Sequence, residues 1–485
     1  GCSMPSRRFL AAFSHWAARQ PDALALVQGD RLVSYARLAE AAAEARAAVA
    51  VLRMPYGATV CVPAEKSPQV IALIIGCLQA GTRVFLPSPD LGTQAMAELC
   101  AEVGCLYVLT PHGVPRRIGD NSSPRAGDEP GLLLTTSGST GLPKTVVLSV
   151  EGVDRFLEWA AGQFTSGPGT TVLNYAPLNF DLCLLDIWAT LNAGGCVELV
   201  EPARATNGRY LRELCRRRPI DLIQAVPMFY RLLADTASDA EDTFTSLAHV
   251  IFTGDVMPLN LLSRLPALFP RAKLWNVYGC TETNDTFLHE VNVSEALDRG
   301  AVAIGRPITG VTTRIVDEAG AVVPAAGSGE LLVASPFQAH GYLDPRLTGQ
   351  KWRDGFYHTG DLVTRDQDGL VFLAGRNDFH VKVRGVRTNL QEVEHVVLGH
   401  EDVLEAAVIA VPDEITGHQL RAVVRRRPRS SLDSIQLRVH CAAKLPRTAI
   451  PALVEIVDDE LPRTSTGKVD RRVLATLEER NRRVD

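Results

Sequence analysis

Residues 59–109 decide the fold class of this chain, and they read TVCVPAEKSPQVIALIIGCLQAGTRVFLPSPDLGTQAMAELCAEVGCLYVL. Three short apolar runs, at 59–62, 83–86 and 106–109, are predicted as strands. The two segments between them, at 70–78 and 97–103, have apolar residues at helical spacing. Strands that alternate with helices indicate βαβ units and a parallel sheet. The stretch therefore predicts an α/β fold.

The same alternation continues on both sides of this stretch. Helices are predicted at 35–52, 152–162 and 184–191, and strands at 171–175, 197–200, 222–225 and 249–253. After about residue 300, alternating strands at 312–317, 330–333 and 370–374 with glycine-rich turns predict antiparallel structure. Beyond Arg376 a compact set of strands and two helices predicts a small α+β unit. We place the boundary near Asp378, with a large domain at 1–377 and a small one at 378–485.

Composition excludes several classes of protein. The 485 residues are 46% hydrophobic and 22% charged, with a net charge of −5, which is typical of a globular protein with large cores. The acidic balance argues against broad binding to nucleic acid or to an anionic membrane. The ten cysteines show no CxxC spacing, which favours reduced thiols and a cytoplasmic protein without a signal peptide. The sequence contains no apolar run of 18 residues, so no membrane-spanning helix is predicted.

The most informative segment for chemistry is LTTSGSTGLPK at 134–144. Hydroxyl side chains, two glycines and one lysine have little packing value, but they offer N–H groups, hydroxyls and a cation to phosphate oxygens. The segment is not a Walker A loop, because Pro143 precedes Lys144 where that motif needs glycine. A surface turn rich in serine and threonine is the structural alternative. The chain has 7 lysines against 43 arginines, so each lysine needs individual inspection.

Four further dense motifs follow in the chain. They are NVYGCTE at 276–282, YHTGD at 357–361, GRNDFHVKVRG at 375–385 and LPRTSTGKVDR at 461–471. Each one alone is compatible with a turn, a helix cap or a hairpin tip. Together and in this order, the five motifs resemble those of the adenylate-forming superfamily, and more closely the amino-acid adenylation domains of nonribosomal peptide synthetases. The resemblance covers nearly the whole chain, from the segment SYARL at 34–38 to Lys468.

The resemblance implies a fold, a reaction and cofactors. The implied fold is α/β, with two helix-flanked β-sheets and a distorted β-barrel in the large domain and a mobile α+β lid. The implied reaction joins a carboxylate to the α-phosphate of ATP, with Mg²⁺, and then passes the acyl group to a phosphopantetheine thiol. Both reactants of the first step are anions, so positive charge must reduce their repulsion.

The resemblance also implies roles for individual residues. Lys468, Lys144, Thr281 and Glu282 are the implied catalytic residues, with Glu282 also on the metal, and Asp378 is the implied hinge. The implied ATP site comprises Thr136, Ser137, Gly138, Ser139, Thr140, Gly141, Asn276, Tyr278, Gly279, Asp361 and Arg376. Asp361 matches the acid that binds both ribose hydroxyls. The segment around Gly385 matches the part of the lid that meets pantetheine in the second step.

Asp181, in the sequence NFD at 179–181, matches the aspartate that binds the α-ammonium group of an amino acid. Buried ammonium groups need such a partner; the alternative is that Asp181 caps the following helix. Motif alignment places the other specificity positions at Leu182, Leu185, Gln224, Ile251, Thr253, Val277 and Asp285. Buried polar groups need hydrogen-bond partners. Either the substrate side chain carries polar or cationic groups, or Asp285 points away; we expect a small-to-medium polar amino acid or a proline-like one.

The sequence leaves the acceptor open. No carrier-protein motif follows Lys468, so we expect a stand-alone enzyme or an excised domain that loads a separate carrier protein in natural-product biosynthesis. Whether a small activating partner protein is needed stays open. An aryl-acid or fatty-acid–CoA ligase on the same scaffold is the alternative, and Asp181 argues against it. A non-enzymatic nucleotide-binding protein is a third class.

Overall fold

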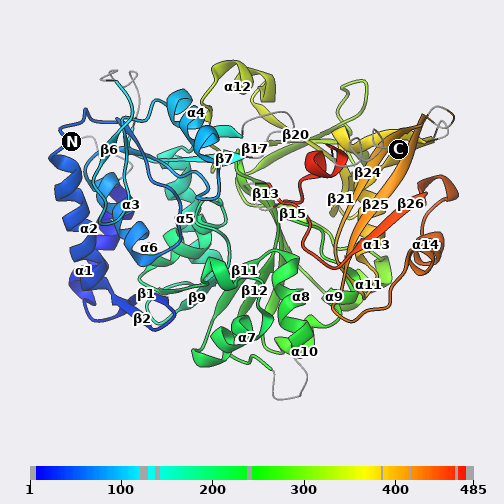
Figure 1. Cartoon of the computed structure of the whole chain (residues 1–485), viewed down its shortest axis with the longest axis horizontal. Coiled ribbons are helices and arrows are strands. Elements are labelled where there is room, and N and C mark those ends of the chain that lie inside the picture. The colour runs from blue at the N-terminus through cyan, green and yellow to red at the C-terminus, as the bar shows by residue number, and fades with distance from the viewer. Residues whose placement is uncertain are drawn as a thin grey trace.

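The structure is a computed structural model that describes residues 7–120, 129–136, 143–236, 243–383, 386–413, 415, 417–464 and 468–476. The predicted glycine-rich loop residues Ser137, Gly138, Ser139, Thr140 and Gly141 lie outside the described residues, as does Gly385. Figure 1 shows the N-terminal helices at one side of the molecule and the C-terminal strands at the other, with the sheets of the large domain between them. No helix in the described ranges has the length and apolar run needed to cross a membrane.

The largest sheet has nine strands in the order β15-β14-β13-β12-β11-β9-β10-β1-β2. Strands β9 to β13 pair in parallel, as the alternating pattern predicts, and β13 pairs with β14 in antiparallel. Their bounds are β1 Leu24–Gln28, β2 Arg31–Ser34, β9 Thr171–Asn174, β10 Cys196–Leu199, β11 Leu222–Ala225, β12 His249–Phe252, β13 Lys273–Cys280, β14 Asn284–Glu290 and β15 Arg306–Pro307.

A second sheet has seven strands in the order β18-β8-β7-β4-β3-β5-β6. The strands are β3 Thr59–Cys61, β4 Arg83–Phe85, β5 Tyr107–Val108, β6 Arg116–Arg117, β7 Leu132–Thr136, β8 Lys144–Val147 and β18 Gly341–Tyr342. Helices of this half are α1 Arg7–Arg19, α2 Tyr35–Ala50, α3 Pro68–Gln79, α4 Thr93–Val103 and α5 Val150–Phe164. The parallel pairings of β3 with β4 and β5 confirm the βαβ units predicted from residues 59–109.

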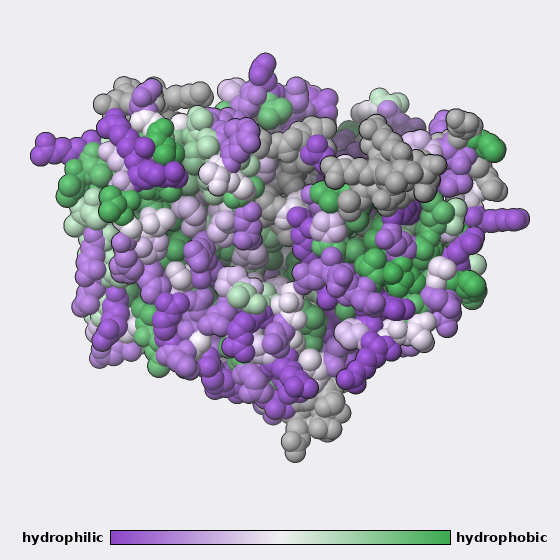
Figure 2. All heavy atoms as spheres, viewed as in Figure 1, coloured by the Kyte–Doolittle hydropathy of each residue, from purple (hydrophilic) through white to green (hydrophobic). Residues whose placement is uncertain are grey.

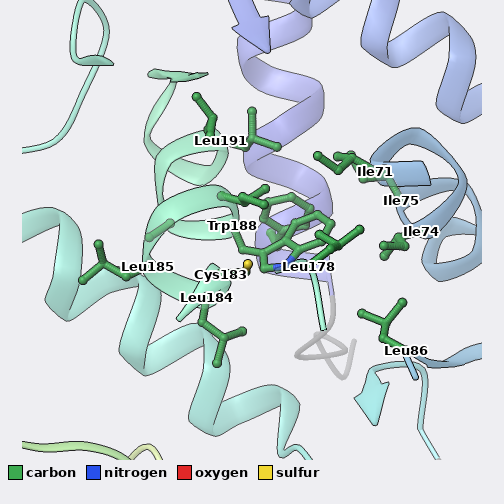
Figure 3. Packing of buried hydrophobic residues seen from close by; sticks show 14 of the residues in the cluster. Ile71, Ile74, Ile75, Leu86, Leu178, Cys183, Leu184, Leu185, Trp188 and Leu191 are labelled. Atoms are coloured by element: carbon green, nitrogen blue, oxygen red, sulfur yellow. The ribbon is translucent and has the colours of Figure 1, made fainter. Parts of the chain in front are cut away.

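Helix α3 shows why this region folds as it does. Ser67 caps the helix through Val70 N–H, and Pro68 follows at the first turn, where its missing N–H costs nothing. Ile71, Ile74 and Ile75 are completely buried in one core cluster that takes strands from both large sheets. In Figure 3 these isoleucines face the indole of Trp188, with Leu178 beside it, while Leu185 points away from the indole. A helix that is apolar all round is buried between layers.

The predicted helix 184–191 begins as a different kind of helix. Leu184–Ala189 form a π-helix, η1, which continues as α6 Thr190–Ala193. Hydrophobic periodicity does not separate π- from α-helical winding, and π-turns are common at functional sites. Asp186, in the middle of η1, is completely buried.

The rest of the large domain contributes helices and a third sheet. The helices are α7 Gly208–Arg217, α8 Pro227–Thr236, α9 Leu259–Leu262, α10 Leu265–Leu268, α11 Val293–Arg299 and α12 Pro345–Lys351. Where the resemblance implied a distorted barrel, five antiparallel strands form a sheet in the order β16-β17-β20-β19, with β21 also paired to β20. They are β16 Thr312–Val316, β17 Gly327–Ala334, β19 Trp352–Arg353, β20 Phe356–Arg365 and β21 Val371–Arg376.

The C-terminal part is a small α+β unit, as predicted. It contains β22 His380–Val383, β23 Val386–Asn389, β24 Val403–Asp413, β25 Gly417–Arg426 and β26 Leu453–Val457, with helices α13 Leu390–Leu398 and α14 Ser434–Ala442. Its core cluster, which includes Val393, Val408 and Leu437, is separate from the clusters of the large domain. Figure 2 shows a mostly hydrophilic face, with hydrophobic side chains gathered on the side of the small domain.

Candidate active site

Several predicted site residues lie at the carboxyl ends of adjacent strands of the largest sheet. Strands β11, β12 and β13 are adjacent and parallel, so their carboxyl ends meet at one edge of the sheet. In open α/β sheets ligands bind outside this edge. Gln224, Thr253, Val277 and Tyr278 come from these strands or directly follow them. The sheet topology therefore brings together residues that lie up to 54 positions apart in the sequence.

The ends of the phosphate-binding segment are fixed by a strand pair. Strands β7 and β8 are antiparallel, and Thr136 pairs directly with Lys144. The ammonium of Lys144 lies 5.3 Å from the ring centroid of Tyr342, a cation–π contact that holds the lysine beside β18. Lys144 thus stands at the base of the segment that the sequence predicts to hold phosphate.

Glu282 is the centre of a buried hydrogen-bond group. Its Oε2 accepts a hydrogen bond from the hydroxyl of Tyr342 at 2.6 Å and from that of Tyr357 at 2.8 Å, and the residue is only 8% exposed. Thr281 precedes it in the turn between β13 and β14. Both phenols bind Oε2, so Oε1 keeps its lone pairs for a cation. One carboxylate together with phosphate oxygens is the ligand set that Mg²⁺ favours, so this residue fits the predicted metal role.

Positive charges surround Glu282. The ammonium of Lys351 lies 5.3 Å from the ring centroid of Tyr357. Burial lowers the pKa of Lys351, the charges of Arg376 and Lys144 lower it further, and Glu282 acts in the opposite direction. Arg376 and Lys144 are thus both within electrostatic range of Lys351. Such a concentration of positive charge suits a triphosphate. Sequence reasoning missed Lys351, although the rarity of lysine in the chain was a usable signal.

Asp361 is held in a fixed orientation before any ligand binds. The hydroxyl of Tyr278 donates to Oδ2 of Asp361, and Nη1 of Arg376 donates to Oδ1 at 3.2 Å. Strands β20 and β21 place Asp361 directly opposite Arg376. Burial raises the pKa of Asp361, while Arg376 and Tyr278 oppose the rise. A preoriented carboxylate of this kind can accept hydrogen bonds from two vicinal hydroxyl groups.

Asn276 and Gly279, two residues of the predicted ATP site, also have structural roles. Nδ2 of Asn276 donates to the carbonyl of Ala303 at 2.8 Å, which ties β13 to the segment before β15. A Cβ on Gly279 would lie 2.3 Å from the carbonyl oxygen of Asn284, so the tight turn that carries Thr281 and Glu282 requires glycine.

Lys468 lies at a hairpin in the small domain and reaches the large one. The Thr464 N–H donates to the Lys468 carbonyl at 2.7 Å, and Arg463 bridges to Val469, while residues 465–467 are outside the described part. The charge of Lys468 lowers the pKa of both Asp181 and Asp361. The charge of the hairpin lysine is therefore within electrostatic range of both the proposed amino-acid aspartate and the proposed ribose aspartate.

Asp181 is not a helix cap. The residue before η1 is Cys183, and that helix end has no side-chain cap. The carboxylate of Asp181 instead hydrogen-bonds the N–H groups of Asp181 itself and of Leu182. Burial and the negative charge of Glu282 raise its pKa to about 6. A buried carboxylate in this situation is ready to pair with a cation.

The specificity positions divide into an apolar and a polar set. Leu185, Ile251 and Val277 are buried in the main core cluster, and Leu182 packs against it. Gln224 and Thr253 are also buried, and their polar groups are hydrogen-bonded. The carboxyl of Asp285 lies within electrostatic range of the carboxyls of Asp181 and Asp186.

A buried polar network that the sequence did not predict lies behind these positions. Nζ of Lys66 donates to Oδ1 of Asn174 at 3.0 Å and to the Tyr175 carbonyl at 3.2 Å. Nδ2 of Asn174 donates to Oδ2 of Asp186 at 2.8 Å, and Nε2 of Gln224 donates to Oδ1 at 3.0 Å. Burial lowers the pKa of Lys66 to about 8 and raises that of Asp186 to about 7. The network fixes Gln224 in one orientation.

Lys66→Met is expected to lower the free energy of unfolding by about 3 kcal/mol, because it leaves the buried carboxylate of Asp186 without its cation. The pKa of Asp186 in the folded protein is about 7, well above its value in the unfolded chain. Below pH 7 this carboxyl is protonated and needs no cation, so the loss should shrink as the pH falls. Urea unfolding at pH 6 and pH 8 measures both effects. Lys273→Met, which alters an exposed lysine, is the matched control, and an equal effect in both variants would contradict the account.

Comparison with known proteins places the chain in a family. The profile of the AMP-binding enzyme family matches residues 13–125 and 118–343, and that of the AMP-binding enzyme C-terminal domain matches residues 392–468. The L-proline–[L-prolyl-carrier protein] ligase of Pseudomonas fluorescens is 33% identical over 95% of this chain and 97% of its own length. Surfactin synthase subunit 1 of Bacillus subtilis is 31% identical over 96% of this chain, which spans 14% of that protein.

Solved structures agree in fold. ATP-bound MatB from Rhodopseudomonas palustris superposes with a TM-score of 0.82 at 23% identity, covering 98% of this chain and 99% of the other. The o-succinylbenzoate CoA synthetase of Bacillus subtilis, solved with its acyl-adenylate intermediate, gives a TM-score of 0.81 at 20% identity, covering 96% and 97%. The chain therefore belongs to the AMP-binding enzyme family of the adenylate-forming superfamily.

Proposed function

We propose that this enzyme uses ATP to activate an α-amino or imino acid as its aminoacyl adenylate, and then passes the aminoacyl group to the phosphopantetheine thiol of a separate carrier protein. The observation that carries the proposal is the carboxylate of Asp361, held ready by hydrogen bonds from Tyr278 and Arg376, in a site where the charge of Lys468 acts on both Asp181 and Asp361. An ammonium-binding carboxylate, a ribose-binding carboxylate and a mobile cation thus lie together in one site.

In the first step an oxygen of the amino-acid carboxylate attacks the α-phosphorus of ATP, and the bond from that phosphorus to the oxygen bridging the α- and β-phosphates breaks. Pyrophosphate leaves with the electron pair of that bond. Asp181 binds the α-ammonium, Asp361 binds the ribose hydroxyls, and Lys468 stabilises the negative charge that accumulates between them. Lys144, Lys351 and Thr281 hold the phosphate groups. Mg²⁺ held at Glu282 would neutralise part of the phosphate charge.

In the second step the thiol attacks the carbonyl carbon of the adenylate, a thioester forms, and AMP leaves. We propose that the small domain turns about Asp378 between the steps, which removes Lys468 from the site. The ion pairs between the small and the large domain are weak enough to allow such a rotation. Arg427 binds Asp235 at 3.1 Å and Arg376 binds Asp378 at 3.0 Å, and partly exposed ion pairs of this kind contribute little to stability.

The carrier protein is proposed because several relatives are named for one. The prolyl-carrier ligase is one such relative, and the D-alanine–D-alanyl carrier protein ligase of Bacillus cereus, 27% identical over 96% of this chain and 99% of its own length, is another. We propose a role in natural-product biosynthesis because other relatives are named surfactin synthase subunit 1 and tyrocidine synthase 3. We also propose a cytoplasmic location, because all nine described cysteines are free thiols and free thiols are typical of that compartment.

Hydroxylamine trapping tests the proposed activity. The enzyme is incubated with ATP, Mg²⁺, hydroxylamine and single acids from a panel that includes neutral, basic and imino amino acids, aryl acids and fatty acids. An aminoacyl hydroxamate, identified by its mass, is the expected product with at least one amino acid. Hydroxamates formed only from aryl or fatty acids would favour the acid–CoA ligase alternative and contradict the role of Asp181.

A further inference from the structure

The side chain of the amino acid would meet three polar residues at the carboxyl edge of the large sheet. Gln224 lies on β11, Thr253 follows β12, and Asp285 lies on β14 opposite Gly279 of β13. We call these three residues the acceptor cluster. The hydrogen-bond partners of each one decide what it can offer to a ligand.

Gln224 has only its amide oxygen left to offer. Its Nε2 donates one hydrogen to the Leu182 carbonyl at 3.1 Å and the other to Oδ1 of Asp186 at 3.0 Å. A carbonyl and a carboxylate accept hydrogen bonds and do not donate them, so the amide orientation is fixed by chemistry. Oε1 is the polar atom that remains, and it is an acceptor.

Thr253 is an acceptor for the same reason. Its hydroxyl donates its single hydrogen to the Val277 carbonyl at 2.7 Å. A threonine hydroxyl has one hydrogen and two lone pairs, so what it can still offer is lone pairs.

Asp285 is a half-buried carboxyl, and none of the described cations forms an ion pair with it. Its backbone N–H donates to Oδ1 of Asn284, but no described residue donates a hydrogen bond to its carboxylate. Burial, together with the nearby carboxyls of Asp181 and Asp186, raises its pKa to about 8. The neighbouring cations have other partners, since Lys66 binds Asn174 and the Tyr175 carbonyl. A half-buried carboxylate of this kind can pair with a cation from outside the chain.

We propose that the amino acid activated by this enzyme carries a second basic nitrogen in its side chain. Its protonated amine would bind the carboxylate of Asp285 and donate to Oε1 of Gln224 and Oγ1 of Thr253. An ammonium group has three hydrogens to donate and no acceptor, which complements a cluster of acceptors. A prolyl or other hydrocarbon side chain would donate no hydrogen bond to the carboxylate of Asp285, to Oε1 of Gln224 or to Oγ1 of Thr253. This inference rests on the proposed function and specifies its substrate as a diamino acid.

Matched pairs of amino acids test the proposal on the wild-type enzyme. The rate of ATP–pyrophosphate exchange is measured as kcat/KM for ornithine against norvaline, 2,4-diaminobutyrate against 2-aminobutyrate, and lysine against norleucine, with proline added. At least one diamino acid should exceed its neutral homologue and proline by about 10²-fold or more, because a site built for hydrogen bonds rejects an analogue that lacks them. If proline or a neutral homologue is used as well as every diamino acid, the inference is overturned and the proposed function stands. Exchange with no amino acid would contradict both.

An isosteric variant tests the role of Asp285 as a specificity residue. Asp285→Asn should reduce the ratio of diamino acid to neutral homologue towards one, whereas Asp298→Asn, which alters an exposed aspartate, should keep it. An unchanged ratio in Asp285→Asn would overturn the proposal. In the wild type the ratio should rise by up to tenfold per pH unit towards pH 8, because a bound ammonium requires the ionised carboxyl. A ratio that falls over this pH range would mean that the neutral carboxyl binds the substrate.

Discussion

Lys468→Ala is expected to lower the rate of amino-acid-dependent ATP–pyrophosphate exchange by about 10²–10³-fold, which is the usual effect of removing one group that stabilises developing charge. Lys468 is exposed on its hairpin, so its loss should leave the folded structure intact. Its charge nevertheless acts on Asp181 and Asp361, the two carboxylates assigned to the amino acid and the ribose. The expected loss is therefore in kcat, with little change in melting temperature.

The matched control for this variant is Lys273→Ala. Lys273 is exposed, and its Nζ lies 3.8 Å from Oε1 of Glu290 in a surface ion pair. It has no proposed role in the active site. Surface pairs of this kind contribute at most about 1 kcal/mol to stability. Exchange in the control should match the wild type. A Lys468→Ala enzyme that keeps exchange within about threefold of the wild type would remove this lysine from the mechanism.

Asp181→Asn is expected to raise the KM for the amino acid by about 10²–10³-fold while leaving the KM for ATP nearly unchanged. Removing one partner of a buried ion pair costs about 3–4 kcal/mol, because the remaining charge stays buried without a partner. Asparagine keeps the size of the side chain but not its charge. The separation of the two KM values distinguishes a binding role from a general loss of folding.

Asp298→Asn is again a suitable control, since Asp298 is exposed on α11. Measurement of initial exchange rates over a range of amino-acid and ATP concentrations gives both constants. An Asp181→Asn enzyme with a normal KM for the amino acid would show that the α-ammonium binds elsewhere.

Much of the fold could be predicted because short strands and amphipathic helices leave local signals. Residues 59–109 gave the correct sequence of strands and helices, with boundaries that differ by one to four residues. The type of helix at Leu184–Ala189 could not be predicted, because apolar periodicity is similar in π- and α-helical winding. The small domain was visible because its core is separate and its pattern compact.

The candidate site was predictable only where its residues lie in dense motifs. The buried network was missed because Lys66, Asn174, Asp186 and Gln224 come from four separate segments and meet only in the folded chain. Tyr342 is separated from Glu282 by 60 residues, so their hydrogen bond has no local signal. The need for a partner at Gln224 could be stated from the sequence. The identity of that partner, Asp186, required the structure.

The most direct test of the central claim is amino-acid-dependent ATP–pyrophosphate exchange by the whole chain, measured for each acid with the wild type and with Lys468→Ala in parallel. The account predicts strong exchange with one α-amino acid or a few closely related ones, lost in the variant. Exchange that requires an aryl or fatty acid, or exchange that persists in Lys468→Ala, would contradict the assignment of Asp181 and Lys468 to a single amino-acid adenylation site.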